Sequence, residues 1–341
     1  MTPFAAALQR RLDPGSAAPL AVALSGGGDS LALLHLTLDW AQVHGRPVLA
    51  LTVDHGLNPD SAAWTASAGA KARALGADWR ALAWEGPKPT TGVQARARAA
   101  RHALLADAAR AAGARVLLMG HTADDIAEGE VMRSADTPGL GRLREWSPSP
   151  TWPEGRGVFL LRPLLQVRRA ELRTYLNARG AAWLDDPANA DPRFARVRAR
   201  QALVGTQAAG AVDLERDPAI PTLARRLEFA AEGAALNRAL IAEAPASATK
   251  AVLAAALLCV SGTTRPPRGP DLERLIGAVA GGRVVTLGGC RIDATGEAVR
   301  IAREPSRRGQ LCAPAEPLSW AKARFEAACG LFPNEASLAR P

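Results

Sequence analysis

The stretch "PLAVALSGGGDSLALLHL", from Pro19 to Leu36, decides the fold of this chain. Leu20 to Leu24 is a short apolar run that ends at a turn signal, and it predicts a buried strand. Ser30 to Gln42 carries leucines at helical spacing and predicts a helix. The glycines between them let another molecule approach the backbone closely. A strand, a glycine turn and a helix N-terminus together predict an anion site, because free N–H groups and the helix dipole face one point.

This turn does not match two common phosphate-binding motifs. No lysine follows the glycines as G-x-x-x-x-G-K-[ST] requires, and Ser30 and Leu31 stand where G-x-G-x-x-G needs later glycines. The residues of the turn are Ser25, Gly26, Gly27, Gly28, Asp29 and Ser30. They resemble the PP-loop signature of the ATP-pyrophosphatase superfamily, which implies that they bind the pyrophosphate part of ATP. The alternative is a plain, tight strand–helix turn.

Strand-like and helix-like segments alternate through the first 120 residues. Further strands are expected at 47–53, 78–84 and 115–120, and helices at 61–76 and 92–113. This alternation predicts an α/β fold with a doubly wound, mostly parallel sheet and helices on both faces.

The pattern then changes. An exposed loop is expected over 134–157, a strand end at 159–165, a helix at 168–180 and an arginine-rich helix that ends near residue 204. The chain is Ala-rich and reads as helical from 206 to 260, and residues 283–304 read as two strands around glycine turns. We expect a PP-loop ATP-binding catalytic domain over 1–205 and a smaller helical, then β-containing, substrate domain over 206–341.

Three polar loops follow expected strands: "SGGGDS", "DHGLNPDS" and "GHTADD". Ligands of parallel sheets bind at the carboxyl ends of the strands. We therefore expect Asp54, His55, Gly120 and His121 to line the ATP site together with the glycine turn.

Asp124, Asp125 and Glu128 form an acidic cluster at a helix start, with Asp125 and Glu128 on one helix face. Carboxylates near phosphates suit Mg²⁺, and Asp29 and Asp125 are the candidate metal ligands. The same acids could deprotonate an attacking amine. The alternative is that they cap the helix and complement its dipole.

Two helices carry arginine groups. Arg98 and Arg101 share a face of the helix at 92–113 and could hold phosphate oxygens, whereas Arg96 reads as solvated. The segment "FARVRAR" supplies Arg196, Arg198 and Arg200, which are candidates for RNA backbone contact. For both groups the alternative is a solvated basic face.

The composition agrees with a polyanionic partner. The 341 residues carry a formal net charge of +9, although abundant Arg, Ala, Gly and Pro could also reflect genomic base composition. The four cysteines form no C-x-x-C pair, no apolar stretch is long enough to span a bilayer, and the N-terminus lacks the apolar core of a signal peptide. A reducing cytoplasm and no membrane association are expected.

Several segments occur in the order seen in tRNA(Ile)-lysidine synthetases: "SGGGDS", "VDHGL", "GHTADD..E", "LLRPLL", "YL..RG..WLDDPAN" and "F.R.R.R". The chain closely resembles that family from about Leu20 to Val204. The resemblance implies that ATP, with Mg²⁺, adenylates the C2 oxygen of the first anticodon cytidine of tRNA(Ile) with anticodon CAU. Free L-lysine then displaces AMP and gives lysidine.

The resemblance also implies roles. Asp29 lies near the metal, Asp125 and Glu128 match acids that bind metal or lysine, and Arg98 and Arg101 match paired catalytic arginines. Arg196 matches the arginine after the family's Asp-Pro-Ser-Asn turn. Departures from the family pattern stand at Gln94, His102, Ile126, Gly129, Ala188, Val197 and the short tract Ser134–Gly141.

Three alternatives remain. A tRNA thiolase would need cysteines near the PP-loop, and the first 258 residues have none. An ammonia-using PP-loop synthetase would act on a small molecule and would lack the basic second domain. A catalytically impaired, RNA-binding relative would carry the departures without activity. The sequence does not set the oligomeric state, for which a homodimer is one option.

Overall fold

The structure is a computed structural model of the chain, and it describes residues 3–134, 143–185, 193, 195–203, 217–230, 232–263, 266–304 and 318–339. The chain divides into two compact units. The first comprises Met1–Leu214 together with Asn334–Pro341, and the second comprises Glu215–Pro333. The boundary expected between residues 205 and 206 lies outside the described residues. No local pattern in the sequence indicates that residues 334–341 belong to the first unit.

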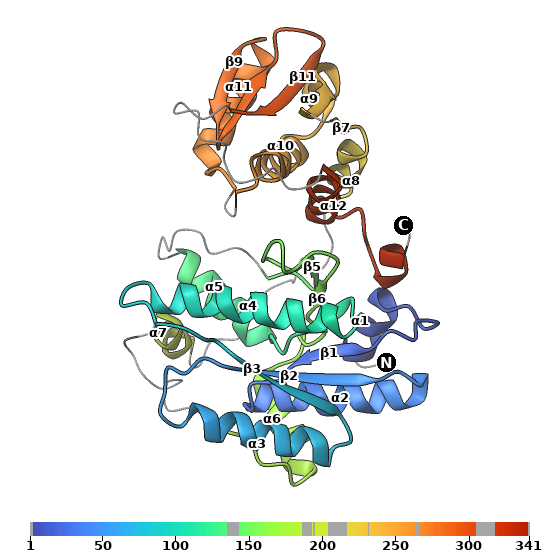
Figure 1. Cartoon of the computed structure of the whole chain (residues 1–341), viewed down its shortest axis with the longest axis vertical. Coiled ribbons are helices and arrows are strands. Elements are labelled where there is room, and N and C mark those ends of the chain that lie inside the picture. Colours follow the sequence, from blue (N-terminus) through green and yellow to red (C-terminus); the bar gives the residue numbers. More distant parts are fainter. Residues whose placement is uncertain are drawn as a thin grey trace. The chain divides into compact units, whose positions relative to one another are not determined.

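The first unit is built on a six-stranded sheet with the order β3-β2-β1-β4-β6-β5 (Figure 1). Its strands are β1 (Leu20–Ala23), β2 (Val48–Asp54), β3 (Asp78–Ala83), β4 (Val116–Leu118), β5 (Trp146–Pro148) and β6 (Phe159–Leu161). Neighbours pair in parallel except β5, which runs antiparallel to β6. The strand order changes direction between β1 and β4, and sheets of this kind bind ligands at such a switch point. The expected doubly wound, mostly parallel sheet is confirmed.

Helices cover both faces of this sheet. They are α1 (Pro3–Arg11), α2 (Gly28–His44), α3 (Ser61–Ala74), α4 (Val93–Ala111), α5 (Ala123–Ser134), α6 (Arg169–Ala178) and α7 (Ala195–Ala202). Figure 1 shows α4 on one face and α2, α3 and α6 on the other. The alternation within β1 explains the two layers: Leu20 and Val22 pack with α2, whereas Ala21 belongs to the core that contains Leu105 of α4.

The second unit combines helices with a five-stranded antiparallel sheet of order β7-β8-β11-β10-β9. The strands are β7 (Glu228–Ala230), β8 (Gly233–Asn237), β9 (Val284–Leu287), β10 (Cys290–Asp293) and β11 (Ala298–Arg303). The helices are α8 (Ala219–Ala224), α9 (Arg238–Glu243), α10 (Ala246–Ser261), α11 (Gly269–Ala280) and α12 (Leu318–Ala328). Buried residues of α10, such as Val252 and Leu253, share a core with Ile292 and Ile301 of the sheet.

Three expectations about local structure are wrong. The Ala-rich stretch 206–260 is not helical throughout, because β7 and β8 lie within it. Residues 283–304 form three strands and not two, and the loop expected over 134–157 contains β5. The sequence of β8, "GAALN", has weak strand propensity, and its pairing with β11 decides its conformation.

The C-terminal segment is held to the first unit by a buried ion pair. The 3₁₀-helix Glu335–Ala339 supplies Glu335, and the Nη1 and Nη2 atoms of Arg46 donate to its two carboxylate oxygens at 2.8 Å each. Arg46 also donates from Nε to the carbonyl oxygen of Ala18 at 3.0 Å. These bonds anchor the end of the chain beside the start of β2.

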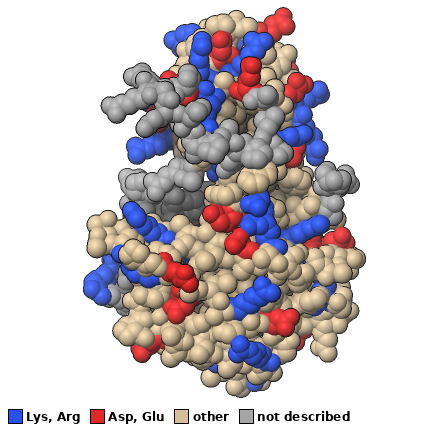
Figure 2. All heavy atoms as spheres, viewed as in Figure 1, with Lys and Arg blue, Asp and Glu red and all other residues tan. Residues whose placement is uncertain are grey.

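Charge is spread over the surface. Figure 2 shows basic and acidic side chains interspersed among uncharged ones on one face. The net charge of +9 is therefore not gathered into a single patch on that face. In the part of the chain that the structure describes, no helix is long and apolar enough to cross a membrane.

Candidate active site

The three loops singled out in the sequence lie at the carboxyl edge of the first sheet. β2 and β4 are the parallel neighbours of β1, so these strands end on the same side. The glycine turn follows β1, Asp54 ends β2, and Gly120 follows β4. Gly120 lies directly against the turn, since a Cβ atom there would come within 3.1 Å of the carbonyl oxygen of Asp29.

The glycine turn is held in shape by its own two serines. The Ser25 and Ser30 hydroxyls lie 3.0 Å apart, Ser30 Oγ accepts from the Ser25 N–H at 3.2 Å, and it donates to the Gly27 carbonyl at 2.9 Å. Gly26 adopts a φ of +86°, a region that favours glycine. The helix α2 begins at Gly28, so its first N–H groups face the turn. This geometry suits an anion such as the pyrophosphate part of ATP.

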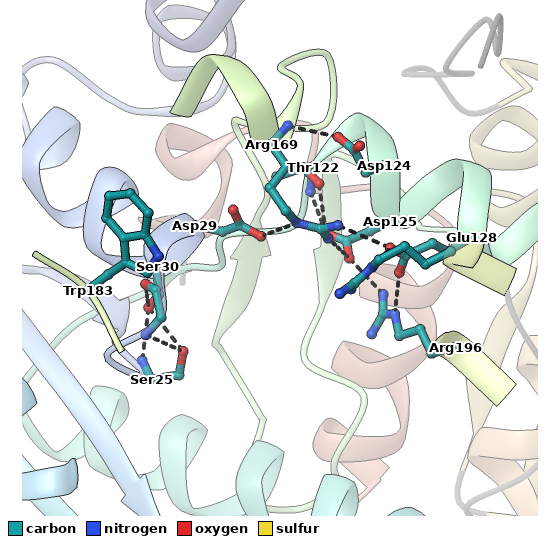
Figure 3. Close-up of polar contacts among 12 residues, drawn as sticks. Ser25, Asp29, Ser30, Thr122, Asp124, Asp125, Glu128, Arg169, Trp183 and Arg196 are labelled. Carbon is teal, nitrogen blue, oxygen red and sulfur yellow. Dashed lines mark hydrogen bonds and ion pairs between the residues drawn. The ribbon is translucent and has the colours of Figure 1, made fainter. Parts of the chain in front are cut away.

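A neighbouring segment packs closely on the turn. The Leu184 N–H donates to the Gly26 carbonyl at 3.0 Å, and a Cβ atom at Gly28 would meet the ring of Trp183 at 3.4 Å. Figure 3 labels Trp183 together with Ser25 and Ser30 of the turn. The segment "WLDDPAN" therefore forms one wall of the PP-loop site, through its first two residues.

Asp125 is fixed by the turn that precedes α5. Its Oδ2 atom accepts from the Thr122 N–H at 2.7 Å and from the Thr122 hydroxyl at 3.1 Å. Thr122 is fully buried and Asp125 is nearly so. The capping that the sequence left open as an alternative is therefore real for Asp125, but it occupies only one carboxylate oxygen.

Arg169, the first residue of α6, joins the acids of the site (Figure 3). Its Nε donates to Asp29 at 3.0 Å, its Nη2 to Asp125 at 3.2 Å and its Nη1 to Glu128 at 3.1 Å. Its backbone N–H donates to Asp124 at 2.8 Å. One residue thus links the acid of the PP-loop to the acids of α5.

Two arginines of α7 reach the same acids from another side. Arg196 donates from Nε to Glu128 and from Nη2 to Asp125, both at 2.9 Å. Arg200 donates from Nε to Glu128 at 2.8 Å. The sequence grouped Arg196 and Arg200 on one helix face for RNA contact, and the structure shows that this face meets the acid cluster. Arg198 is exposed and donates to the Arg193 carbonyl at 2.9 Å.

These contacts set the protonation of the acids. Burial raises the pKa of Asp29 above its ordinary value, and the hydrogen bond and charge of Arg169 offset that effect only in part. Burial also acts to raise the pKa of Glu128, but the hydrogen bond from Arg200 and the charges of Arg169 and Arg196 outweigh it and lower that pKa. Glu128 is therefore a carboxylate at neutral pH.

A basic group lies close to Arg196. Arg98 and Arg101 of α4, His121 after β4 and Arg162 after β6 influence one another electrostatically. Burial and then the charge of Arg98 lower the pKa of Arg101 to about 10, and burial holds His121 in its neutral form. The Nε of Arg101, the Nδ1 of His121 and the Nε of Arg162 are buried without a hydrogen-bond partner within the described residues. These donors could serve a negatively charged group.

The loop after β2, with Asp54 and His55, makes fewer contacts with the other site residues. The Oδ1 atom of Asp54 accepts from the Gly56 N–H at 2.8 Å, which closes a local turn. Burial and then the charge of Arg101 lower the pKa of His55, so His55 is a neutral ring close to the basic group. His55 also makes an edge contact with the ring of Trp84, at 6.2 Å between centroids.

The two expected metal ligands, Asp29 and Asp125, differ in whether a carboxylate oxygen is left to bind a metal ion. Both oxygens of Asp125 already accept hydrogen bonds from Thr122, Arg169 and Arg196. Within the described residues, only Oδ2 of Asp29 accepts a hydrogen bond, from Arg169. No group of three or more His, Cys, Asp or Glu side chains among the described residues could hold a metal ion by itself. The acids therefore do not fit a metal site made by the protein alone.

Sequence reasoning missed Arg169, Thr122 and Trp183. Arg169 lies in "RRAELRTYLNARG", which reads as an ordinary amphipathic helix, and nothing local marks one arginine as a site residue. Trp183 and Thr122 stand inside segments that the resemblance quoted, but their contacts depend on packing. The tract Ser134–Gly141 and the turn at Ala188 lie outside the described residues, apart from the backbone of Ser134.

Comparisons with known proteins agree with this geometry. A family model described as a PP-loop domain matches residues 1–207. The chain is 54% identical over 301 residues to the tRNA(Ile)-lysidine synthase of Caulobacter vibrioides, covering 88% of this chain and 70% of that protein.

Two further relatives carry the same description. The tRNA(Ile)-lysidine synthase of Hyphomonas neptunium is 38% identical over 350 residues, covering 97% of this chain and 92% of that protein. That of Methylobacterium nodulans is 38% identical over 334 residues, covering 89% and 96%. The likeness therefore extends through both units of the chain.

Proposed function

Because the chain belongs to the tRNA(Ile)-lysidine synthase family, within the wider group that shares the PP-loop domain, we propose that it makes lysidine. The substrates are ATP, free L-lysine and tRNA(Ile) with anticodon CAU, and the compartment is the cytoplasm. The observation that carries the proposal is that the PP-loop lies next to an acid cluster. Asp29 of the PP-loop and the Asp125–Glu128 pair of α5 accept hydrogen bonds from the same guanidinium, that of Arg169.

The first step is adenylation. O2 of the anticodon cytidine attacks the α-phosphorus of ATP, a new P–O bond forms, and pyrophosphate leaves. The N–H groups at the start of α2 and the hydroxyls of Ser25 and Ser30 would hold the departing phosphates, since they surround the glycine turn. The buried donors of Arg101 and His121 could stabilise the negative charge that develops.

The second step is aminolysis. The ε-amine of lysine attacks C2 of the adenylated cytidine, a C–N bond forms, and AMP leaves with the former O2 atom. Free lysine is mostly protonated at neutral pH, with an amine pKa of about 10.4, so a base must take its proton. Glu128 and Asp125 support this role because they lie on one helix face. Glu128 is also a carboxylate at neutral pH and can therefore accept a proton.

ATP would bring its metal with it. Mg²⁺ in phosphate-transfer sites keeps most of its shell as water and phosphate oxygens and needs only one or two carboxylates. The second oxygen of Asp29 suits that minor share. The metal would supply charge neutralisation for the phosphates, and Asp29 would orient the complex at the start of α2.

The tRNA backbone would contact α7 and its surroundings. Arg198 is exposed and supports direct phosphate contact, whereas Arg196 and Arg200 supply positive charge close to the acids. Arg198 would therefore hold the tRNA backbone close to the site where both steps occur.

The direct test is incubation with tRNA(Ile) of anticodon CAU, ATP and labelled lysine, followed by nucleoside analysis. Labelled lysidine is expected, and replacement of the first anticodon cytidine by uridine is the matched substrate control. Absence of lysidine despite ATP binding in the presence of Mg²⁺ would favour the impaired RNA-binding relative. A product formed with ammonium in place of lysine would favour the ammonia-using synthetase.

A further inference from the structure

Arg169 stands where the sequence expected a metal ion. Its guanidinium lies between Asp29 on one side and Asp125 and Glu128 on the other (Figure 3), with three N–H···O distances of 3.0 to 3.2 Å. We infer that Arg169 is a positioning residue: its fixed cation, and not Mg²⁺, holds the PP-loop acid and the α5 acids together in the substrate-free protein. Its positioning role rests on the proposed function, whereas its place as the resident cation is a property of the free protein.

The charges of the cluster support this role. Three carboxylates, those of Asp29, Asp125 and Glu128, face three guanidinium groups, those of Arg169, Arg196 and Arg200. These six side chains together are close to neutral, and the carboxylate of Asp124, which accepts from the backbone N–H of Arg169, is not counted among them. A free divalent cation finds no surplus negative charge there, and every oxygen of Asp125 and Glu128 already accepts a hydrogen bond.

Arg169 differs from the two other arginines of the cluster. The side chains of Arg196 and Arg200 are 45% and 39% exposed, whereas that of Arg169 is 15% exposed. In the described residues only Arg169 contacts both the PP-loop acid and the acids of α5. Its backbone is fixed as well, because its N–H at the start of α6 donates to Asp124. It is therefore the rigid member that sets the spacing of the two acid groups.

A consequence concerns the order in which ligands enter. The phosphates of ATP bring the negative charge that the cluster lacks, so a divalent cation should enter only as a complex with ATP, at the open oxygen of Asp29. Removing the charge of Arg169 would leave the acids in excess and create a site for a free cation.

The experiment measures Mn²⁺ binding by electron paramagnetic resonance, with Mn²⁺ as the probe ion and without tRNA or lysine. Wild-type protein should bind no Mn²⁺ tightly without ATP and should bind it with ATP. Arg169→Gln should gain at least about tenfold in Mn²⁺ affinity without ATP, because a unit charge at hydrogen-bond distance is removed. Arg179→Gln is the matched control: Arg179 directly follows the last residue of α6 and pairs with Asp39 at 3.0 Å, and this variant should behave as wild type.

Arg169→Lys is the second variant, in case Arg169→Gln fails to fold. Circular dichroism checks the fold of both variants. Lysine keeps the positive charge but cannot make the same three hydrogen bonds to Asp29, Asp125 and Glu128. This variant should therefore exclude Mn²⁺ without ATP and bind ATP more weakly. The inference is overturned if wild type or Arg169→Lys binds Mn²⁺ without ATP, or if folded Arg169→Gln gains no affinity. A failure of the proposed function would appear separately, as wild type that binds no Mn²⁺ even with ATP.

Discussion

Among single residues, Asp29 and Asp125 both accept a hydrogen bond from the guanidinium of Arg169, but they differ in how many of their carboxylate oxygens are engaged. Asp125 is held by Thr122, Arg169 and Arg196 through both of its oxygens, which fixes its position and leaves none open. Asp29 keeps one oxygen that accepts no hydrogen bond from the part of the chain that the structure describes, and its side chain is 25% exposed. Asp29 is therefore suited to meet an incoming ligand, and Asp125 is suited to orient its neighbours.

Asp29→Ala should abolish pyrophosphate release and leave the fold intact. The acid lies at the first turn of α2, where the complex of ATP with its metal needs a carboxylate beside the glycines. Pyrophosphate release on addition of ATP and tRNA is the measurement. Asp39→Ala is the control, since Asp39 lies on the same helix but is paired with Arg179 on the surface. Near-normal pyrophosphate release by folded Asp29→Ala would rule out the assignment of Asp29.

Glu128→Gln should slow lysine transfer by on the order of 10²-fold, the range for loss of a general base. Glu128 is 1% exposed and accepts from three arginines, so glutamine keeps the shape and removes the charge. An adenylated tRNA should accumulate in single-turnover assays, while ATP binding changes less. Equal losses of ATP binding and lysine transfer would instead assign Glu128 to the nucleotide site.

At the scale of elements, α7 shows how one short helix can serve two partners. The face with Arg196 and Arg200 meets the acids of α5, and Arg198 points to another side. Helical spacing separates Arg198 from the other two. Arg196 and Arg200 therefore lie on one helix face, as the spacing predicts. Within this protein, however, that face contacts the acids Asp125 and Glu128.

The salt dependence of tRNA binding should separate these faces. Arg198→Ala should lower the slope of log affinity against log salt by about 0.7–0.9, the value for one lost phosphate contact. Arg200→Ala should leave that slope unchanged, because its charge is already paired with Glu128. Filter binding over a series of salt concentrations measures both. A smaller slope for Arg200→Ala and an unchanged slope for Arg198→Ala would reverse the assignment.

The contact between α3 and β3 should tolerate no side chain at Gly69. A Cβ atom there would lie 2.6 Å from the ring of Trp79. That ring cannot move freely, because its Nε1 donates to Thr52 at 3.0 Å and the guanidinium of Arg73 lies over it at 4.5 Å. Gly69→Ala should cost about 1–3 kcal/mol in the free energy of unfolding.

Denaturant titration measures that loss. The double variant with Trp79→Leu is the control, since a smaller side chain makes room for the added methyl. The two changes should then be non-additive. Additive costs would mean that the methyl does not meet the ring.

At the scale of the whole molecule, the end of the chain belongs to the first unit although the second unit precedes it. The second unit is thereby joined to the first at both of its ends. The ion pair of Arg46 with Glu335 is the main polar anchor, and both side chains are almost fully buried, at 0% and 2% exposed. Asp13 adds to it by donating its N–H to Glu335 at 3.0 Å.

Glu335→Gln should destabilise the first unit by about 3–5 kcal/mol, the range for removal of one partner from a buried pair. Glu273→Gln, which breaks the exposed pair with Lys250, should leave the unfolding midpoint unchanged. Equilibrium unfolding in denaturant gives both values. Replacing both partners by apolar residues, Arg46→Met with Glu335→Leu, should recover most of the loss. A stable Glu335→Gln single variant would show that the C-terminal anchor lies elsewhere.

The sequence by itself determined the fold of the first unit and the identity of the phosphate loop. Both depend on local patterns: apolar runs of strand and helix length, and glycines at a strand–helix turn. Residue type and spacing also single out Glu128 and the arginines of α4 and α7 as candidate site residues. Tertiary structure alone decided that β8 is a strand, that Glu335 returns to Arg46, and that Arg169 joins Asp29 to α5. Each of these depends on contacts between residues more than 40 positions apart, and no local pattern encodes which distant partner a side chain will meet.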